Sequence, residues 1–299
     1  MTNHSKPVLP ATPRGTHAVV VGGGTMGADV AIVLARGGCR VTVVEPSPAA
    51  QTKLPSHVTE ALAELGLAAR AQHVAVVATL SEVAWPDVAL VVECIPEKLP
   101  LKQALFAELV QHAPATAVLA SNSSSFPISA IAQGLPTAQR MLGLHFFMPA
   151  HLVPLVEVVL GPSSAPEVAD GLCAFMRGCA SVPVRVQKDK PGFLANRLQH
   201  ALSREAFALI DEGVATPEDV DAAVRFGFGF RFLAAGPVMQ RDHAGIDVHC
   251  AAAATMYPSL SRASRRFARP RGGGPLGHEN WRRFLPLDPR SDASRARPL

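Results

Sequence analysis

The chain has 299 residues, of which 48% are hydrophobic and 17% are charged. This composition excludes an intrinsically disordered chain and fits one large domain or two ordinary ones. The formal net charge of +4 is unevenly distributed, because residues 259–299 contain ten Arg and only three acidic residues. That tail carries +7 and residues 1–258 carry −3. The tail is the only feature that favours a nucleic-acid partner, and we expect none.

Residues 1–16 are polar and contain Pro, which predicts a flexible N-terminus without a secretory signal. No run of about 18 apolar residues exists, so no membrane span is expected. The five Cys are odd in number and lack the spacing of zinc ligands, so we expect reduced thiols and no metal site. Together these features predict a cytoplasmic protein that does not associate with a membrane.

Short apolar, β-branched segments predict buried strands at 17–21, 39–45, 74–78, 88–94, 117–121, 141–147, 155–160 and 182–186. Helical spacing of apolar residues predicts helices at 26–36, 99–112 and 166–179. Residues 17–187 are therefore predicted to form an α/β domain of the Rossmann type, with a doubly wound, mostly parallel sheet.

The strand pattern stops after Lys190, and residues 193–212 are expected to form a long helix. Thr216 is predicted to cap a further helix, with Pro217 at its first position and acidic residues in its first turn. Residues 188–258 thus form a smaller, all-α domain in this prediction. Residues 259–299 lack periodicity and are predicted to be an irregular basic tail.

Gly22, Gly24 and Gly27 form a G-x-G-x-x-G pattern between the first strand and the first helix of a βαβ unit, which is typical of dinucleotide-binding proteins. Gly22 permits the tight turn, Gly24 allows the backbone to approach a pyrophosphate, and Gly27 allows close packing of helix on strand. The helix N-terminus, with Thr25 and Met26, offers N–H groups to the phosphates. The alternative is an ordinary glycine turn.

Glu45 ends the second strand, 18 residues after Gly27. A carboxylate at this place accepts a hydrogen bond from a ribose 2′-hydroxyl and repels a 2′-phosphate. The sequence therefore predicts NAD as cofactor in preference to NADP, unless Glu45 is merely a surface residue.

His145 and Glu157 each lie within an apolar strand segment. A lone buried His is most often a satisfied core residue, whereas a lone buried Glu needs a partner because an unpaired carboxylate is costly to bury. A His–Glu pair would satisfy both side chains and would give a general base able to remove a hydroxyl proton.

The segments GGGTMG, ECIPEKLPLK, SNSSSF, GLHFF, PLVEVV and DKPGFLANR, in this order, resemble the L-3-hydroxyacyl-CoA dehydrogenase family over about residues 17–258. Its relatives include carnitine and gulonate dehydrogenases and lambda-crystallin. The resemblance implies a homodimer that oxidises the 3-hydroxyl of a 3-hydroxyacyl-CoA with NAD. A dehydrogenase of a non-CoA 3-hydroxy acid and a catalytically impaired structural homologue are the alternatives.

The resemblance also implies roles for individual residues. It makes His145 the catalytic base and Glu157 its partner, with Ser124 and Asn196 positioning the substrate. It places Glu97, Lys102 and Ser124 in contact with NAD. The alternative for Glu97 and Lys102 is that both lie in the solvent-exposed first turn of a helix and bind nothing.

Two departures from the family pattern bear on the substrate. Met148 stands where the family usually has an Asn that contacts the cofactor. The segment after Glu45 is shorter than the helical hairpin that carries CoA contacts in the family. The sequence of residues 150–154 differs from that of the acyl-CoA dehydrogenases and is more similar to the non-CoA relatives. His151 either lines the substrate pocket or, as we favour, lies on the surface.

The family normally ends with a Lys-Thr-Gly-x-Gly-Phe-Tyr segment, which this chain lacks. One permitted coding of His278–Asp288, read from its second base, gives Met-Lys-Thr-Gly-Glu-Gly-Phe-Tyr-Arg-Trp. The single codon of Trp281 forces the first Gly of that reading. We therefore expect the tail from about residue 259 to be a frameshifted version of the family's last helices, with a genuine basic tail as the rival.

Overall fold

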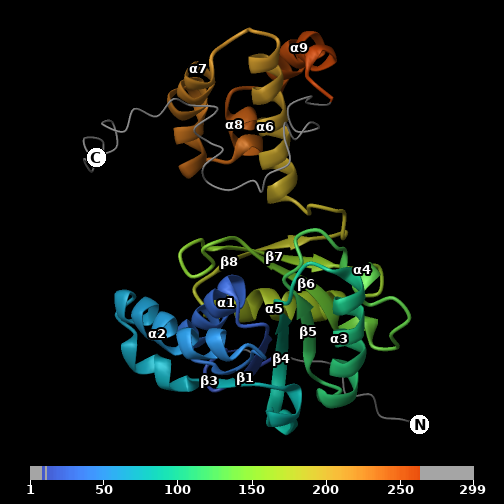
Figure 1. Ribbon diagram of the computed structural model, residues 1–299. Coiled ribbons are helices and arrows are strands. Elements are labelled where there is room, and N and C mark those ends of the chain that lie inside the picture. The colour runs from blue at the N-terminus through green and yellow to red at the C-terminus, as the bar shows by residue number, and fades with distance from the viewer. Residues whose placement is uncertain (1–8, 11, 263–299) are drawn as a thin grey trace, which may run out of the picture. The chain divides into compact units, whose positions relative to one another are not determined.

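The computed structural model describes residues 9–10 and 12–262. The chain divides into two compact units between Asn196 and Arg197, and each is described separately (Figure 1). Of the predicted flexible N-terminus, 1–16, the structure describes residues 9–10 and 12–16. The tail from residue 263, with most of the segment expected to be frameshifted, also lies outside the described residues.

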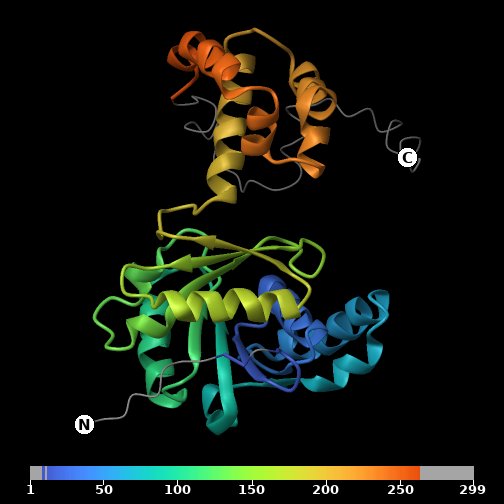
Figure 2. The same ribbon diagram turned by 180° about the vertical axis from the view of Figure 1, so that it is seen from behind.

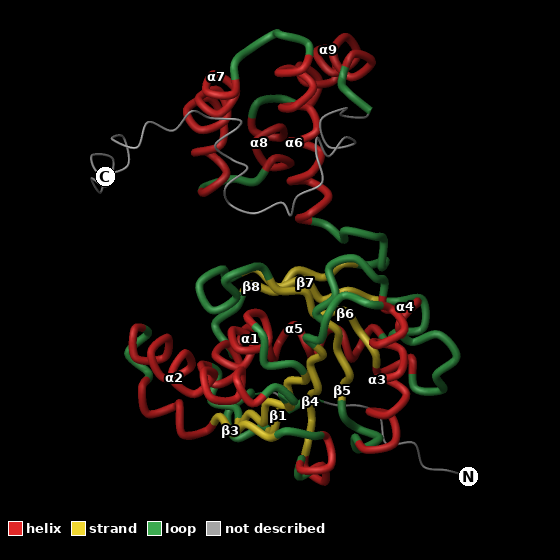
Figure 3. The backbone as a smooth tube through the Cα atoms, viewed as in Figure 1, coloured by secondary structure: helices red, strands yellow, loops and turns green. Residues whose placement is uncertain are grey.

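The first unit is built on one eight-stranded sheet with the order β3-β2-β1-β4-β5-β6-β7-β8 (Figure 3). Neighbouring strands are parallel except for the antiparallel pair β6–β7. This arrangement confirms the predicted Rossmann-type, mostly parallel sheet. The strands are β1 His17–Val21, β2 Arg40–Val44, β3 Val74–Val77, β4 Val88–Glu93, β5 Val118–Ser121, β6 Met141–Phe146, β7 Leu155–Leu160 and β8 Val182–Val186.

Helices cover both faces of this sheet. Because side chains alternate along a strand, Ala18 and Val20 of β1 face one layer while Val19 and Val21 face the other. The first layer contains α1 Thr25–Arg36, α2 Pro48–Glu64 and α5 Pro166–Gly178, of which α5 is seen in front of the sheet in Figure 2. The second layer contains α3 Leu99–His112 and α4 Ile128–Ile131.

The strand order indicates where along the carboxyl ends of the strands a ligand would bind. The chain fills β1, β2 and β3 in one direction and then returns to β4 on the other side of β1, so the order reverses between β1 and β4. Ligands of open α/β sheets bind outside the carboxyl ends of the strands at such a reversal. The glycine turn follows the carboxyl end of β1, and Ser121 is the residue at the carboxyl end of β5.

The second unit is helical, as predicted. It contains most of α6 Ala195–Asp211, followed by α7 Pro217–Ala222, a π-helical turn Ala223–Phe228, α8 Pro237–His243 and α9 Ile246–Met256. The hydroxyl of Thr216 accepts the N–H of Asp219 at 3.2 Å, which confirms the predicted helix cap. Among the described residues of this unit only Ala208 is buried, and many large apolar side chains are exposed.

Within the described part of the chain, no helix combines the length and the apolar character needed to cross a membrane.

Candidate active site

The glycine turn joins β1 to α1 at the reversal of strand order. Gly22 has a φ of +99°, a value that favours glycine, and a Cβ there would lie 2.8 Å from the carbonyl oxygen of Cys94. A Cβ on Gly27 would lie 1.7 Å from the carbonyl oxygen of Gly22, so only glycine lets α1 pack this closely on the turn. A Cβ on Gly24 would meet no atom within 4 Å.

Space and hydrogen-bond donors are therefore both present at the start of α1. Gly24 is the N-cap of α1 and provides no side-chain cap, and no acidic residue lies in the first turn. The N–H groups of Thr25, Met26 and Gly27 precede the first carbonyl-bonded N–H of the helix, that of Ala28. These donors and the helix dipole suit an anion such as a pyrophosphate.

Glu45 follows β2 beside this turn and is largely buried. Its Oε2 accepts the N–H of Gly23 at 2.7 Å, and its Oε1 accepts the N–H of Ser47 at 2.8 Å. Each carboxylate oxygen has a second lone pair, so further acceptor capacity is left for a ribose hydroxyl. The hydrogen bonds fix the carboxylate at the edge of the glycine turn.

His145 and Glu157 face each other across the antiparallel strands β6 and β7. The Nδ1 atom of His145 lies 2.8 Å from Oε2 of Glu157, and both side chains are buried. The other carboxylate oxygen, Oε1, accepts the N–H groups of Leu194 at 3.0 Å and Ala195 at 2.7 Å. The predicted pair is present, and both oxygens of its carboxylate are used.

The surroundings of Glu157 keep it ionised. Burial by itself raises the pKa of this carboxyl, but the hydrogen bonds from His145 and from the two N–H groups outweigh burial and hold the pKa below its usual value. An ionised Glu157 accepts a hydrogen bond from the N–H at Nδ1 of His145, so the free lone pair of the neutral imidazole lies on Nε2. The pair is therefore arranged for Nε2 to accept a proton from a substrate.

The two predicted substrate-positioning residues lie next to elements of this pair. Asn196 directly follows Ala195, whose N–H binds Glu157. Ser124 lies two residues after Asn122, whose Oδ1 accepts the N–H of Phe146 at 2.9 Å, next to His145. Among the interactions found within the described residues, none involves the side chain of Ser124 or Asn196, so both remain available to a ligand.

Glu97 and Lys102 belong to a polar network at the carboxyl ends of β4 and β5. The ammonium of Lys102, which is almost fully buried, lies 2.7 Å from Oε1 of Glu93 and 3.1 Å from Oε2 of Glu97. The alternative required Lys102 to be solvated, and its burial rules this out. Oε1 of Glu97 accepts the hydroxyl of Ser123 at 2.5 Å.

These contacts determine the charge of Glu97. Burial by itself raises the pKa of the carboxyl, but the hydrogen bond from Ser123 and the charge of Lys102 outweigh it and lower the pKa. With Glu97 partly exposed, its carboxylate can face a cofactor at this edge while Lys102 holds it in place. Glu93 and Ser121, whose hydroxyl lies 2.5 Å from Oε2 of Glu93, complete the network.

His151 is not a surface residue, contrary to the expectation from the sequence. Its side chain is only 11% exposed, and Nδ1 lies 3.1 Å from Oδ1 of Asp29. Asp29 is buried in α1 and also accepts the N–H of Ala150 at 2.9 Å and binds His57. This carboxylate attaches α1 to the loop after β6. Met148, which precedes Ala150 in that loop, is 68% exposed.

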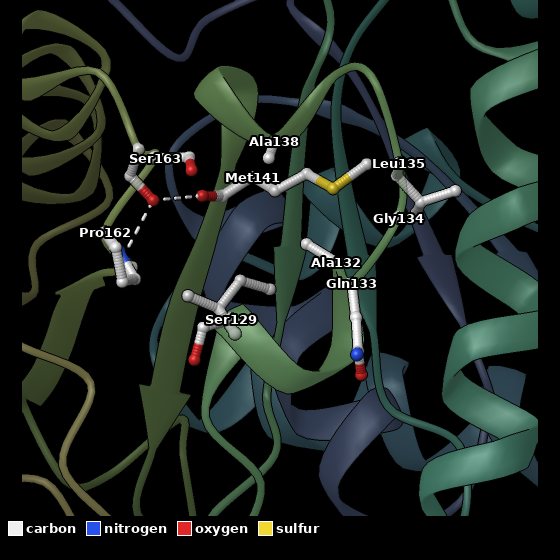
Figure 4. Close-up of a pocket in the computed structure, with 12 residues that line it drawn as sticks. Ser129, Ala132, Gln133, Gly134, Leu135, Ala138, Met141, Pro162 and Ser163 are labelled. Carbon is white, nitrogen blue, oxygen red and sulfur yellow. Dashed lines mark hydrogen bonds between the residues drawn. The ribbon is translucent and has the colours of Figure 1, made fainter.

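A hollow of about 210 Å³ lies at the opposite end of β6, beside Met141 and Ala138 (Figure 4). Its lining residues include Ser129, Gln133 and Leu135 but no ionisable side chain. Because it lacks an acid or a base and adjoins the start of β6, it is separate from the His145–Glu157 pair and offers no catalytic group.

Two family models match almost the whole described chain. The NAD-binding domain of 3-hydroxyacyl-CoA dehydrogenase matches residues 17–190, and the C-terminal domain of 3-hydroxyacyl-CoA dehydrogenase matches residues 192–271. The chain belongs to the 3-hydroxyacyl-CoA dehydrogenase family. The second match reaches beyond residue 258, where the motif resemblance ends.

Relatives in this family differ in the names of their substrates. The chain is 33% identical over 247 residues to a 5-formyl-3-hydroxy-2-methylpyridine 4-carboxylate 5-dehydrogenase of Mesorhizobium japonicum, covering 81% of this chain and 80% of that protein. It is 34% identical over 244 residues to the mitochondrial hydroxyacyl-coenzyme A dehydrogenase of Homo sapiens, covering 77% and 76%.

A solved structure of a 5-formyl-3-hydroxy-2-methylpyridine 4-carboxylic acid 5-dehydrogenase, described as an NAD⁺-dependent dismutase, has the same fold. It superposes with a TM-score of 0.76 at 29% identity and covers 89% of this chain and 86% of that chain. NAD is the cofactor of this family, and the open space at Gly24, the uncapped start of α1 and the fixed carboxylate of Glu45 fit it. The protein is an NAD-dependent oxidoreductase that acts on a CH–OH group.

Proposed function

We propose that this protein oxidises the 3-hydroxyl of an L-3-hydroxyacyl-CoA, of the size of 3-hydroxybutyryl-CoA, to the 3-ketone. The observation that carries the proposal is the buried His145–Glu157 pair, at 2.8 Å, within a sheet that also forms a dinucleotide turn. Bound NAD supplies the acceptor for the hydride that leaves the carbinol carbon.

The side chains then have distinct tasks. Nε2 of His145 takes the hydroxyl proton, and Glu157 stabilises the imidazolium that results. The side chains of Ser124 and Asn196 donate hydrogen bonds to the substrate oxygens and so orient the carbinol carbon. Gly22, Gly24 and Gly27, with the N–H groups of Thr25 and Met26, are proposed to bind the pyrophosphate.

Three further charged residues are proposed to act on the cofactor. Glu45 is proposed to bind the ribose of NAD, and Glu97 is proposed to contact the cofactor directly. Lys102, whose ammonium already has two carboxylates and the carbonyl oxygen of Ile95 as partners, is proposed to act on NAD chiefly by orienting Glu97.

A non-CoA substrate is the second candidate, and one feature of the fold favours it. Between β2 and β3 the chain has the helix α2 and a short 3-10 turn, Ala68–His73, in place of the long helical hairpin expected of CoA-binding members. The pyridine-carboxylate relative from Mesorhizobium japonicum supports the same direction. L-Carnitine and gulonate are further substrates of this class.

A substrate panel tests both candidates. We expect NADH formation with NAD and 3-hydroxybutyryl-CoA, and little with NADP, because Glu45 repels a 2′-phosphate. Activity confined to L-carnitine, gulonate or a pyridine carboxylate would replace the CoA proposal with the second candidate. Binding of NAD without turnover of any of these substrates would support a structural homologue. The homodimer and the cytoplasmic location remain predictions, to be tested by light scattering and by fractionation.

A further inference from the structure

Phe193 adopts an unusual backbone conformation immediately before α6. Its φ is +47°, and among the described residues only Ala180 shares a positive φ without being glycine. The left-handed region is disfavoured for a bulky side chain, and such strained residues persist where their surroundings fix them, often at functional sites. Phe193 is also buried, with 4% of its surface exposed.

The backbone of Phe193 directs two donors at one oxygen. The preceding Gly192 is also left-handed, with a φ of +77°, and the N–H groups of the two residues after Phe193 both bind Oε1 of Glu157. Successive N–H groups that converge in this way form a concave site for an anion. The conformation of Phe193 therefore sets the orientation of the Glu157 carboxylate.

The ring of Phe193 contacts the other member of the pair. Its centroid lies 5.4 Å from that of the His145 imidazole, and the ring of Phe147 lies 4.6 Å from the same imidazole. These aromatic rings limit the rotation of the imidazole and keep water from the bond between Nδ1 and Glu157. One residue thus contacts His145 through its side chain and controls Glu157 through its backbone.

We propose that Phe193 is a positioning residue for the His145–Glu157 pair, with the backbone orienting the carboxylate and the ring orienting the imidazole. Its effect on turnover rests on the proposed function. Its effect on the carboxylate does not, because the titration of Glu157 can be measured without a substrate.

Two variants separate the backbone from the ring. Phe193→Gly keeps the left-handed conformation readily and removes the ring, whereas Phe193→Val disfavours that conformation because valine is β-branched. Ala180 provides backbone controls, since Ala180→Gly and Ala180→Val introduce the same two residues at an exposed left-handed position after α5, where no ring is removed. The full-length protein is used throughout, and NAD affinity reports whether the dinucleotide turn is intact.

The titration of Glu157 is followed by NMR of its carboxyl carbon, and kcat is measured with the best substrate of the panel. In Phe193→Val we expect the midpoint of Glu157 to rise by about one pH unit, because two N–H donors are lost. In Phe193→Gly that midpoint stays, and kcat falls about tenfold at unchanged NAD affinity, because the imidazole loses the ring that orients it. Both Ala180 variants keep the wild-type titration of Glu157 and the wild-type kcat.

A wild-type titration of Glu157 in Phe193→Val, or a wild-type kcat in Phe193→Gly, would overturn the proposal. If Phe193→Val does not fold, Phe193→Gly decides alone, and an unchanged kcat refutes the role of the ring and with it the proposal. If the wild-type protein turns over no substrate, the proposed function fails, while the titration of Glu157 still supports or refutes the positioning of its carboxylate.

Discussion

Substitution of Gly27 by Ala is expected to damage the dinucleotide turn through a clash that can be located in the structure. The added Cβ would lie 1.7 Å from the carbonyl oxygen of Gly22 and 3.3 Å from the Cβ of Cys94. The nearest atom belongs to the backbone of the turn, so no side-chain rotation can relieve the contact. Helix α1 has to move away from β1, or the turn has to change its shape.

The expected destabilisation follows from this geometry. Overpacking of a tightly packed site costs about 1–3 kcal/mol, and a clash with fixed backbone belongs at the upper limit of that range. For a domain of this size, about 3 kcal/mol corresponds to a decrease in Tm of roughly 6–12 °C. The same displacement moves the N–H groups at the start of α1, so NAD affinity falls as well.

Gly24→Ala is the matched control, because its Cβ would meet no protein atom within 4 Å and its φ of −65° is ordinary for alanine. We expect this variant to keep the wild-type Tm and to lose NAD affinity, since the methyl group occupies the space proposed for the pyrophosphate. Thermal unfolding and calorimetric titration with NAD measure both quantities. A wild-type Tm in Gly27→Ala, or wild-type NAD affinity in Gly24→Ala, would refute the reasoning.

Three further predictions concern buried charge and the tail. Lys102→Met leaves the fully buried Glu93 without its cation and should reduce the free energy of unfolding by about 3–5 kcal/mol. Arg40→Ala breaks an exposed pair with Asp87 and should reduce it by less than about 1 kcal/mol. Chemical denaturation measures both variants, and equal losses would contradict the contrast. Because folding lowers the pKa of Glu157, its stabilisation is complete above the unfolded value of about 4.3 and is lost as the pH falls through the folded pKa. Denaturation between neutral pH and about pH 3 should therefore show the Glu157→Gln variant losing less stability than the wild type, and parallel losses would exclude this contribution. For the basic tail, the nucleotide sequence should contain a site where a single-base change restores Lys-Thr-Gly-x-Gly-Phe-Tyr, and its absence would leave a genuine tail.

The sequence predicted the sheet well because its strands are short, β-branched and buried on both faces. The bounds of β1, β7 and β8 agree residue for residue with the predicted segments, β3, β4, β5 and β6 differ by one residue at one end, and β2 is one residue shorter at each end. The His145–Glu157 pair could also be predicted, since each residue is a costly polar group in an apolar strand that needs a partner.

The helix and the polar contacts that the sequence did not predict depend on unusual local sequence or on contacts between residues distant in the chain. Helix α2 contains Pro55 in its interior, where a proline normally breaks a helix, so no helical pattern was recognised there. Glu93 and Asp29 have partners distant in sequence, such as Ser121 and His151, and spacing alone does not pair them. An ionisable residue that follows two valines at a strand end, as Glu93 does, was the available signal.

The most direct test of the catalytic assignment is the turnover of the His145→Ala variant with NAD and the best substrate of the panel, measured alongside NAD affinity. We expect kcat to fall by about 10²–10⁴-fold, the usual contribution of a general base, while NAD binds as tightly as in the wild type. Turnover near the wild-type value, with NAD affinity retained, would contradict the role of His145 as the base.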